Sequence, residues 1–221
     1  MGCSMYVYAG IRLRFCPTSN FKSDLMQLTP VSDPFSLFAS WFEEAEANEP
    51  GLPHAMSAAT VNAAGTPSLR MVLLKGVDER GFVFYTNTQS RKAAELKENG
   101  HAALCFHWKS IRRQVRIEGA VAFVTDAEAD EYWASRPRDT QIGAWASKQS
   151  ESYADRSEFD AAITAHETRF AGKSVPRPAF WTGYRVFPAQ IEFWQEQPSR
   201  LHDRLVYNRA DNSWTTKFLY P

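Results

Sequence analysis

Short strands joined by tight turns are the feature that most constrains the fold of this chain. Apolar and polar residues alternate with a period of two in Ala55–Asn62, Pro67–Gly76 and Gly81–Asn87. Such short connections require antiparallel neighbours, because a parallel pair needs a crossover of a dozen residues or more. A sheet of about seven such strands is most stable when it closes into a barrel, which removes its edges. The later strands are predicted at His101–Trp108, Ile111–Val124, Gly183–Trp194, Leu201–Tyr207 and Trp214–Leu219.

Helices are predicted around this sheet. Asp33 is a typical N-cap and Pro34 suits the first helical position, and the helix that they start ends before Pro50. Its apolar residues recur at helical spacing, at Phe35, Phe38, Trp41 and Phe42. Shorter helices are predicted over about 91–98, 126–135 and 151–171. The fold class is therefore α+β, a mainly antiparallel barrel with flanking helices, in one domain over residues 33–221. Residues 1–32 are predicted to form a loosely ordered N-terminal arm.

The composition excludes several classes of function. The 221 residues contain 25 Lys and Arg against 25 Asp and Glu, so the net charge is zero, which argues against nucleic-acid binding and does not oppose a homo-oligomer. Three cysteines without a Cys-x-x-Cys pair, and five histidines without a ligand pair, predict neither disulfides nor a metal site. No apolar run reaches the ~20 residues that span a membrane. The arm does not resemble a secretory signal, so we expect a cytoplasmic protein.

Two segments suggest oxyanion sites. Arg91 and Lys92 fall in the first turn of a predicted helix, where the helix dipole disfavours cations unless an anion is bound, so we predict a phosphate site there. Tyr132, Arg136 and Thr140 surround the end of another helix and suit a second phosphate. The alternative for that second group is a helix C-terminus whose dipole favours cations.

Two further groups of cations lie on predicted strands. Arg70 and Lys75 are separated by an odd number of residues and should face opposite sides, either at a site or as charges that reach solvent from the strand ends. Arg200, His202 and Arg204 should all face one side of a strand. No nucleophilic serine in a suitable context accompanies His202, so a catalytic triad is not predicted. Stacking of these arginines on a bound ring fits better.

Several of these segments recur in the same order in one enzyme family. They read RMVLLK at 70–75, FYTN and SRKA within 84–93, RQVR at 113–116, SRPRDTQIGAW at 135–145, EFWQ at 192–195 and RLHDR at 200–204. Together they closely resemble the pyridoxine (pyridoxamine) 5′-phosphate oxidase family, collinearly from about Asp33 to Pro221. The resemblance implies a homodimer of split β-barrels, with a C-terminal dimerisation region and FMN at the subunit interface.

The resemblance also implies an activity. It is the oxidation of pyridoxamine or pyridoxine 5′-phosphate to pyridoxal 5′-phosphate, with electrons passing through FMN to O₂. Hydrogen peroxide is then formed, and ammonia is released from the amine substrate. The alternatives are a flavin reductase on a related split barrel, or a non-catalytic carrier of FMN or pyridoxal phosphate.

The resemblance assigns site residues as well. Those that match FMN-binding positions, some of them expected from the partner subunit, are Arg70, Met71, Val72, Leu73, Leu74, Lys75, Tyr85, Thr86, Arg91, Lys92, Gln114, Gln149, Ser150, Trp194 and Arg204. Those that match substrate-binding positions are Lys75, Tyr132, Arg136, Thr140, Arg200, Leu201 and His202, of which Arg200 and His202 are the predicted catalytic pair.

Two departures from the family pattern stand out. Thr140 replaces the usual Ser but keeps the hydroxyl, so we expect phosphate binding to be kept. Residues 17–20 lack the Arg-rich stretch ending in Glu-Tyr that helps to cover the substrate in many members, so we expect a weaker or differently built lid.

Overall fold

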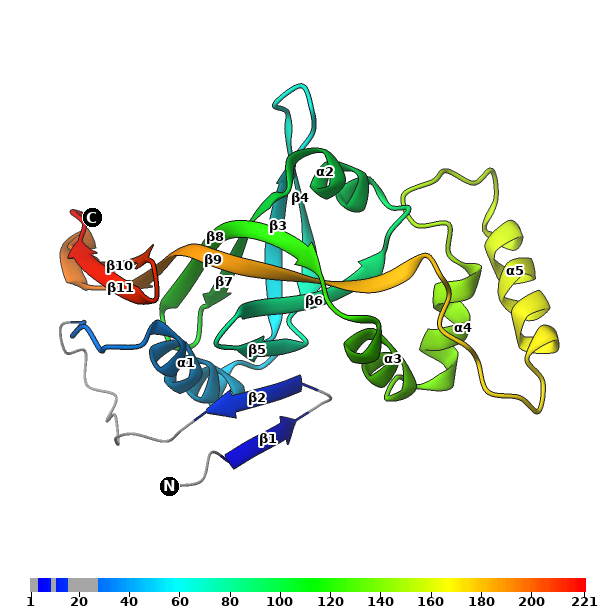
Figure 1. Cartoon of the computed structure of the whole chain (residues 1–221), viewed down its shortest axis with the longest axis horizontal. Coiled ribbons are helices and arrows are strands. Elements are labelled where there is room, and N and C mark those ends of the chain that lie inside the picture. The colour runs from blue at the N-terminus through cyan, green and yellow to red at the C-terminus, as the bar shows by residue number, and fades with distance from the viewer. Residues whose placement is uncertain (1–3, 9–10, 16–27) are drawn as a thin grey trace.

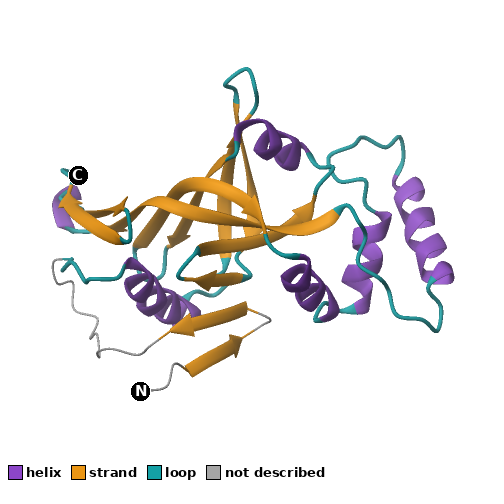
Figure 2. Ribbon diagram, viewed as in Figure 1, coloured by secondary structure: helices purple, strands orange, loops and turns teal. Residues whose placement is uncertain are grey.

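The computed structural model describes residues 4–8, 11–15 and 28–221, and within them a curled sheet surrounded by helices (Figures 1 and 2). The described residues form an eleven-stranded sheet. Its strands are β1 (Ser4–Tyr8), β2 (Ile11–Phe15), β3 (Ala55–Val61), β4 (Pro67–Leu73), β5 (Gly76–Asp78), β6 (Gly81–Asn87), β7 (His101–Trp108), β8 (Arg113–Phe123), β9 (Trp181–Gln195), β10 (Asp203–Ala210) and β11 (Ser213–Phe218).

The strand order explains why the sheet curls. It runs β1-β2-β5-β6-β9-β8-β7-β3-β4, with β10 added to β9 and β11 to β10, and its pairs are antiparallel except β2 with β5. The last strand of this path, β4, leads through only Leu74 and Lys75 into β5 near its start. The amide of Lys75 donates to the carbonyl of Val83 on β6, at 2.8 Å. The two ends of the barrel therefore meet at Lys75, and the predicted antiparallel split barrel is confirmed.

Helix α1 (Pro34–Asn48) packs on the barrel and supplies much of its core. The carboxylate of Asp33 accepts hydrogen bonds from the amides of Phe35 and Ser36, at 3.1 and 3.0 Å, as predicted for an N-cap. The fully buried Phe38 ring lies 4.9 Å from the ring of Phe82 and 5.3 Å from that of Phe106. Burial of each such ring contributes roughly 1.5–3 kcal/mol, so α1 is fixed against the sheet mainly by its apolar face.

The remaining helices are α2 (Arg91–Asn99), α3 (Asp126–Ala134), α4 (Arg138–Ala146) and α5 (Arg156–Arg169), with a 3₁₀ turn at Pro198–Arg200. Helix α4 was not predicted. Pro137 follows the helix predicted over 126–135 and, being a proline, favours its end, but it also stands at the N-cap of α4 and so begins the next helix. The helix predicted over 151–171 begins only at Arg156, because Asp155 caps it by accepting from the amide of Ser157 at 2.9 Å. None of the helices in the described ranges is long and apolar enough to cross a lipid bilayer.

The chain preceding α1 is tied to the C-terminal strands. The amide of Leu28 donates to Asp203 at 3.3 Å, and the amide of Val31 donates to the Tyr207 hydroxyl at 2.9 Å. Strands β1 and β2 lie within the predicted arm, whose status as a separate unit stays a prediction. The 17–20 stretch on which the lid prediction rests lies outside the described residues.

Candidate functional site

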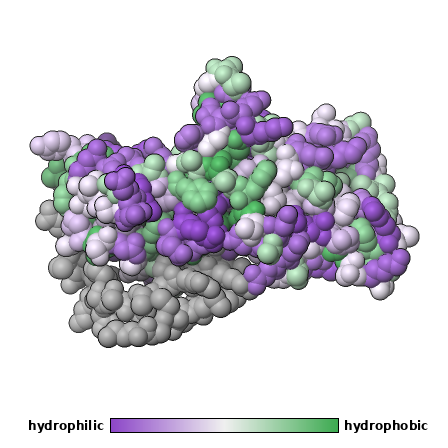
Figure 3. Space-filling view, viewed as in Figure 1, coloured by the Kyte–Doolittle hydropathy of each residue, from purple (hydrophilic) through white to green (hydrophobic). Residues whose placement is uncertain are grey.

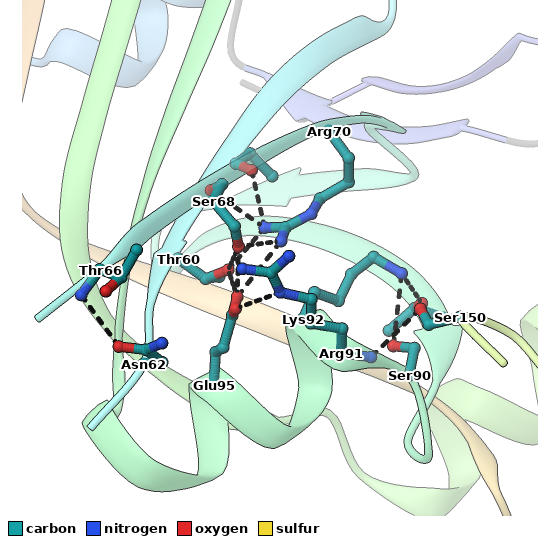
Figure 4. Close-up of polar contacts among 12 residues, drawn as sticks. Thr60, Asn62, Thr66, Ser68, Arg70, Ser90, Arg91, Lys92, Glu95 and Ser150 are labelled. Carbon is teal, nitrogen blue, oxygen red and sulfur yellow. Dashed lines mark hydrogen bonds and ion pairs between the residues drawn. The ribbon is translucent and has the colours of Figure 1, made fainter. Parts of the chain in front are cut away.

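Arg91 and Lys92 begin α2 and meet the loop that follows α4 (Figure 4). The Lys92 ammonium donates to the Thr86 hydroxyl at 2.9 Å and to the side-chain oxygen of Gln149 at 2.5 Å. The amide of Arg91 donates to the Ser150 hydroxyl at 3.2 Å. The structure therefore brings together five of the residues that were predicted to bind the flavin. We call Thr86, Arg91, Lys92, Gln149 and Ser150 the α2 cluster.

The start of α2 is suited to an anion in two further ways. Its N-cap, Ser90, makes no side-chain hydrogen bond to the helix, because its hydroxyl donates to the carbonyl of Asn87 at 2.8 Å. The first amides of the helix therefore make no hydrogen bond to the Ser90 side chain, and the Arg91 amide donates to Ser150 instead. Burial, together with the nearby charge of Arg70, lowers the pKa of Lys92 to about 8. A bound phosphate would favour the charged form of this lysine again.

Sequence reasoning missed Glu95, the carboxylate of this region. Its side chain is 4% exposed, and it pairs with Arg70 at 3.2 Å and with Arg91 at 2.8 Å. Glu95 therefore supplies part of the negative charge that was predicted near Arg91 and Lys92. The signal that could have revealed Glu95 is its i,i+4 spacing from Arg91, at which opposite charges on a helix attract.

The residues between Arg70 and Lys75 divide by side-chain direction. Met71 is 61% and Leu73 36% exposed, whereas Val72 is half-buried and Leu74 is fully buried in the core. The side chain of Leu74 therefore packs inside the barrel. Arg70 pairs with Glu95, whereas Lys75 lies beyond the end of β4 at Leu73, so the alternation of strand faces predicted for the two residues does not extend to Lys75.

Lys75 belongs to a second group, the α3 cluster, formed with Tyr132, Arg136 and Thr140. The Lys75 ammonium lies 5.8 Å from the centre of the Tyr132 ring, and the Arg136 guanidinium donates to the carbonyl of Thr140 at 2.9 Å. Burial lowers the pKa of Lys75, and Arg136 lowers it further. Thr140 directs its hydroxyl to the carbonyl of Pro137, at 2.7 Å. The four predicted substrate-phosphate residues therefore lie together.

The α3 cluster holds two partly buried cations, and burial lowers the pKa of Arg136, which the nearby charge of Asp139 only partly offsets. Within the described ranges neither Lys75 nor Arg136 forms an ion pair, and the Nε of Arg136 is buried without a hydrogen-bond partner. The Arg136 guanidinium lies 4.9 Å from the centre of the Trp181 ring instead. Burying two cations close together is costly without an anion. This arrangement favours an anionic ligand over the alternative of a helix end that merely attracts cations.

The ring of Tyr85, on β6, stacks against rings of α3 and β9. Its ring lies 4.2 Å from the ring of Tyr132 and 5.2 Å from that of Trp181, both nearly parallel to it. Gly183 pairs with Tyr85 across β6 and β9, and a Cβ atom at Gly183 would come within 2.7 Å of the tyrosine ring. Gly183 therefore leaves room for the ring of Tyr85 because it has no side chain.

Two arginines hold α3, and with it Tyr132, against the barrel. Arg185 of β9 is 6% exposed and pairs with Asp78 at 2.6 Å and with Glu128 of α3 at 2.7 Å. Arg177 pairs with Asp126 at 2.8 Å and Asp130 at 2.6 Å, on either side of Glu128. Sequence reasoning missed the ion pairs of Arg177 and Arg185 because the paired residues are far apart along the chain.

A third group lies near the other end of β9. Gln114, Trp194 and Arg204 are neighbours across β8, β9 and β10. The His202 ring lies 4.7 Å from that of Trp194. Arg204 forms two hydrogen bonds to the buried carboxylate of Glu192, at 2.8 and 3.1 Å. We call Gln114, Trp194, Arg200, Leu201, His202 and Arg204 the C-terminal group.

The prediction that Arg200, His202 and Arg204 share one strand face is wrong. Strand β10 begins only at Asp203, and Arg200 lies in the 3₁₀ turn with a φ of 61°. The chain bends there because Ser199 also has a positive φ, of 58°, so the extended backbone that the prediction assumed is interrupted. Arg200 and Leu201 are both exposed, and Arg200 has no hydrogen bond or ion pair to any described residue.

The α3 cluster and the C-terminal group are far apart within one chain (Figure 1). Trp181 contacts the former, Trp194 belongs to the latter, and the two lie near opposite ends of β9. At ~3.3 Å per residue, the strand between them is roughly 40 Å long. A single chain therefore does not bring all the predicted site residues to one small ligand.

The clamp on α3 yields a test of stability. We expect Arg185→Met to destabilise the protein by about 3 kcal/mol, because it removes a buried cation that is hydrogen-bonded to two half-buried carboxylates, Asp78 and Glu128. Arg80→Met is the matched control. Arg80 contacts the same two carboxylates, at 2.6 and 2.9 Å, but it is 50% exposed, so its loss should cost less than about 1 kcal/mol. Urea unfolding would measure both, and equal costs would contradict the assigned role of Arg185.

Comparison with known proteins places these clusters in a family. The model described as pyridoxamine 5′-phosphate oxidase matches residues 42–170, and the one described as the pyridoxine 5′-phosphate oxidase C-terminal dimerisation region matches residues 181–221. Among curated proteins, the pyridoxine/pyridoxamine 5′-phosphate oxidase of Caulobacter vibrioides is 58% identical over 88% of this chain and 87% of the relative. The corresponding protein of Sphingopyxis alaskensis is 52% identical over 96% and 99%.

Solved structures agree on the fold. PhzG from Burkholderia lata, in complex with tetrahydrophenazine-1-carboxylic acid, superposes with a TM-score of 0.81 at 33% identity, over 87% of this chain and 94% of that one. An FMN-binding protein from Nostoc punctiforme, related to pyridoxamine 5′-phosphate oxidase, gives a TM-score of 0.68 at 16% identity, over 84% and 95%. With two family models that together match most of its residues, and with relatives at 52–58% identity, this chain belongs to the pyridoxamine 5′-phosphate oxidase family.

Proposed function

We propose that this protein is an FMN-dependent oxidase that converts pyridoxamine and pyridoxine 5′-phosphate to pyridoxal 5′-phosphate, with O₂ as the electron acceptor. The observation that carries the proposal is the pair of separate cationic clusters, one at the start of α2 and one around Lys75 and Arg136. Two phosphorylated rings need two such sites. The names of curated relatives at 50–58% identity support this reading.

The residues present fit a phosphorylated flavin. Lys92, Arg91 and the first amides of α2 would hold its phosphate, since charge-assisted hydrogen bonds are worth roughly 1.5–3 kcal/mol each. Gln114, Trp194 and Arg204 would contact the flavin of the partner subunit. When bound, FMN accepts the electrons of the substrate and passes them to O₂, so that hydrogen peroxide is released.

The substrate would lie between the α3 cluster and the C-terminal group. Lys75, Tyr132, Arg136 and Thr140 would bind its phosphate, while Arg200, Leu201 and His202 would place its pyridine ring. The Nδ1 of His202 accepts from the amide of Gln197 at 3.2 Å, so the proton of the neutral ring is on Nε2. His202 would therefore donate a hydrogen bond to the amine or alcohol of the substrate. With the amine substrate, water would supply the aldehyde oxygen and ammonia would leave.

A homodimer accounts for the distance between these groups. Subunits related by a two-fold axis would place the C-terminal group of one next to the α3 cluster of the other. Strand β4 ends the sheet path and exposes Leu69 and Met71 by 68% and 61%. Apolar surface also lies over the central strands in the view of Figure 3. An exposed apolar edge strand needs a cover, and a second copy of this chain would supply it at the proposed FMN interface.

The activity is tested with the purified protein loaded with FMN. We expect pyridoxamine phosphate and pyridoxine phosphate each to give one aldehyde and one hydrogen peroxide per turnover under air. Aldehyde would be followed by absorbance and peroxide by a coupled peroxidase. Bound FMN without aldehyde from either substrate would support the carrier alternative. FMN reduction by a nicotinamide cofactor, without aldehyde, would support the flavin reductase.

Arg200 is tested by removing its side chain. We expect Arg200→Ala to retain FMN but to lose at least tenfold in kcat/KM, because the exposed guanidinium has no structural partner among the described residues and is free to contact substrate. Arg209→Ala, which removes another exposed arginine from the same C-terminal region, is the control and should stay close to wild type. Loss of FMN from Arg200→Ala would show that this arginine was misassigned.

Lys92 gives a prediction of pH dependence. The pKa of Lys92 in the protein without ligand is lowered to about 8, so the ammonium is present below that pH and is lost as the pH rises through it. Affinity for FMN should therefore fall between about pH 7.5 and 9.5. Lys92→Met should bind FMN about ten- to a hundredfold more weakly at pH 7, with little further fall. Fluorescence titration measures both, and a fall of the same size in the variant would exclude Lys92 as its cause.

A further inference from the structure

Glu95 lies beneath the cations of α2, on the side that faces strands β3 and β4 (Figure 4). One of its oxygens accepts from the Nε of Arg91 at 2.8 Å. The other accepts from Arg70 at 3.2 Å, from the Ser68 hydroxyl at 2.5 Å and from the Thr60 hydroxyl. Both oxygens of this buried carboxylate are thus engaged by donors, and two of the donors are guanidinium groups.

The carboxylate of Glu95 is ionised over the whole range in which the protein would work. Burial alone would raise the pKa of Glu95, but hydrogen bonds from Ser68, Thr60, Arg91 and Arg70 outweigh it and lower the pKa to about 2. This depressed pKa stabilises the folded state above the ordinary pKa of a glutamate, and the stabilisation is lost as the pH falls towards 2. Glu95 is therefore a fixed negative charge close to the cations of the α2 cluster.

The two arginines use this charge differently. Arg70 commits both terminal nitrogens to the protein, since it also donates to the carbonyl of Ala58 at 3.0 Å and to the hydroxyls of Thr60 and Ser68. Arg91 donates to Glu95 only through Nε, and its side chain is 60% exposed. Its two terminal nitrogens have no hydrogen-bond partner among the described residues. The arginine that remains available to a ligand is thus Arg91, and Glu95 anchors it at Nε.

We propose that Glu95 is a positioning residue for the flavin phosphate, which acts by holding Arg91 so that its terminal nitrogens face the phosphate at the start of α2. The inference rests on the proposed function, in that the ligand is FMN. Arg70 donates to the second oxygen of Glu95 and so helps to hold the carboxylate in place beneath Arg91. A free arginine side chain loses rotamer entropy when it binds a ligand, and the anchor at Nε reduces that loss because it restricts the side chain before the ligand arrives.

A purely structural role for Glu95 makes a different prediction. Glu95 also ties α2 to the β3–β4 hairpin through Thr60 and Ser68, so its loss could loosen the whole site. Such loosening would weaken binding of any flavin. Loss of the anchor on Arg91 should weaken only flavins that carry a phosphate. Riboflavin, which lacks the phosphate, therefore separates the two roles.

The test compares dissociation constants for FMN and riboflavin, measured by quenching of flavin fluorescence. We expect Glu95→Gln, which keeps an acceptor but removes the charge, to weaken FMN binding about tenfold and riboflavin binding less than twofold. Glu98→Gln, an exposed glutamate on the same helix, is the control and should change neither. If Glu95→Gln does not fold, Glu95→Asp withdraws the carboxylate from Arg91 without removing the charge, and the same selective loss is expected.

A double-mutant cycle tests whether Glu95 acts through Arg91. In an Arg91→Met background, Glu95→Gln should weaken FMN binding less than twofold further. Equal loss of FMN and riboflavin affinity, unchanged FMN affinity, tighter FMN binding, or additive effects in the cycle would each overturn the inference while leaving the proposed function intact. Wild-type protein that binds neither flavin would overturn the proposed function and this inference with it.

Discussion

The meeting of the two barrel ends at Leu74 and Lys75 is the constraint on which the site depends. Leu74 is buried in the core, so the chain is fixed where it leaves β4. The next residue bonds to β6 through its amide and directs its ammonium towards α3. The burial of Leu74, which closes the barrel, therefore also places the cation of Lys75 where the two barrel ends meet. A charge at that point loses solvation, and the lowered pKa of Lys75 records the cost.

The two cationic clusters solve the same electrostatic problem in different ways. The α2 cluster lies above a buried glutamate, so its arginine, Arg91, and the neighbouring Arg70 have a carboxylate partner within the protein. The α3 cluster has no such carboxylate among the described residues, and its arginine rests on tryptophan rings. Under the proposed function, the first holds a resident cofactor and the second a substrate that must leave. A permanent counter-charge suits the former, whereas an unneutralised pair suits a ligand that is released at every turnover.

The length of β9 determines how far apart the α3 cluster and the C-terminal group lie within one chain. One strand carries Trp181 near one end and Trp194 near the other, and each contributes to a different group of predicted site residues. Because β9 is one continuous extended strand, Trp181 and Trp194 stay far apart within one chain. The match of residues 181–221 to a dimerisation region agrees with this reasoning. In the proposed dimer, the strand that separates the two groups would be the element that extends towards the partner.

From the sequence alone, local periodicity predicted the antiparallel barrel, and capping residues predicted that Asp33 is the N-cap of α1. Local charge and helix position predicted part of the α2 and α3 clusters, and the family resemblance implied the rest. Only the tertiary structure revealed Glu95 beneath Arg70 and Arg91, the clamp of Arg185 on Glu128, the extra helix α4, and the position of Arg200 outside the strand. Ion pairs between distant segments leave no periodic signal, and a backbone bend at Ser199 depends on dihedral angles that residue types specify weakly. Sequence patterns therefore predicted the candidate site residues, and the packing of the chain determined their ion pairs and their positions along the barrel.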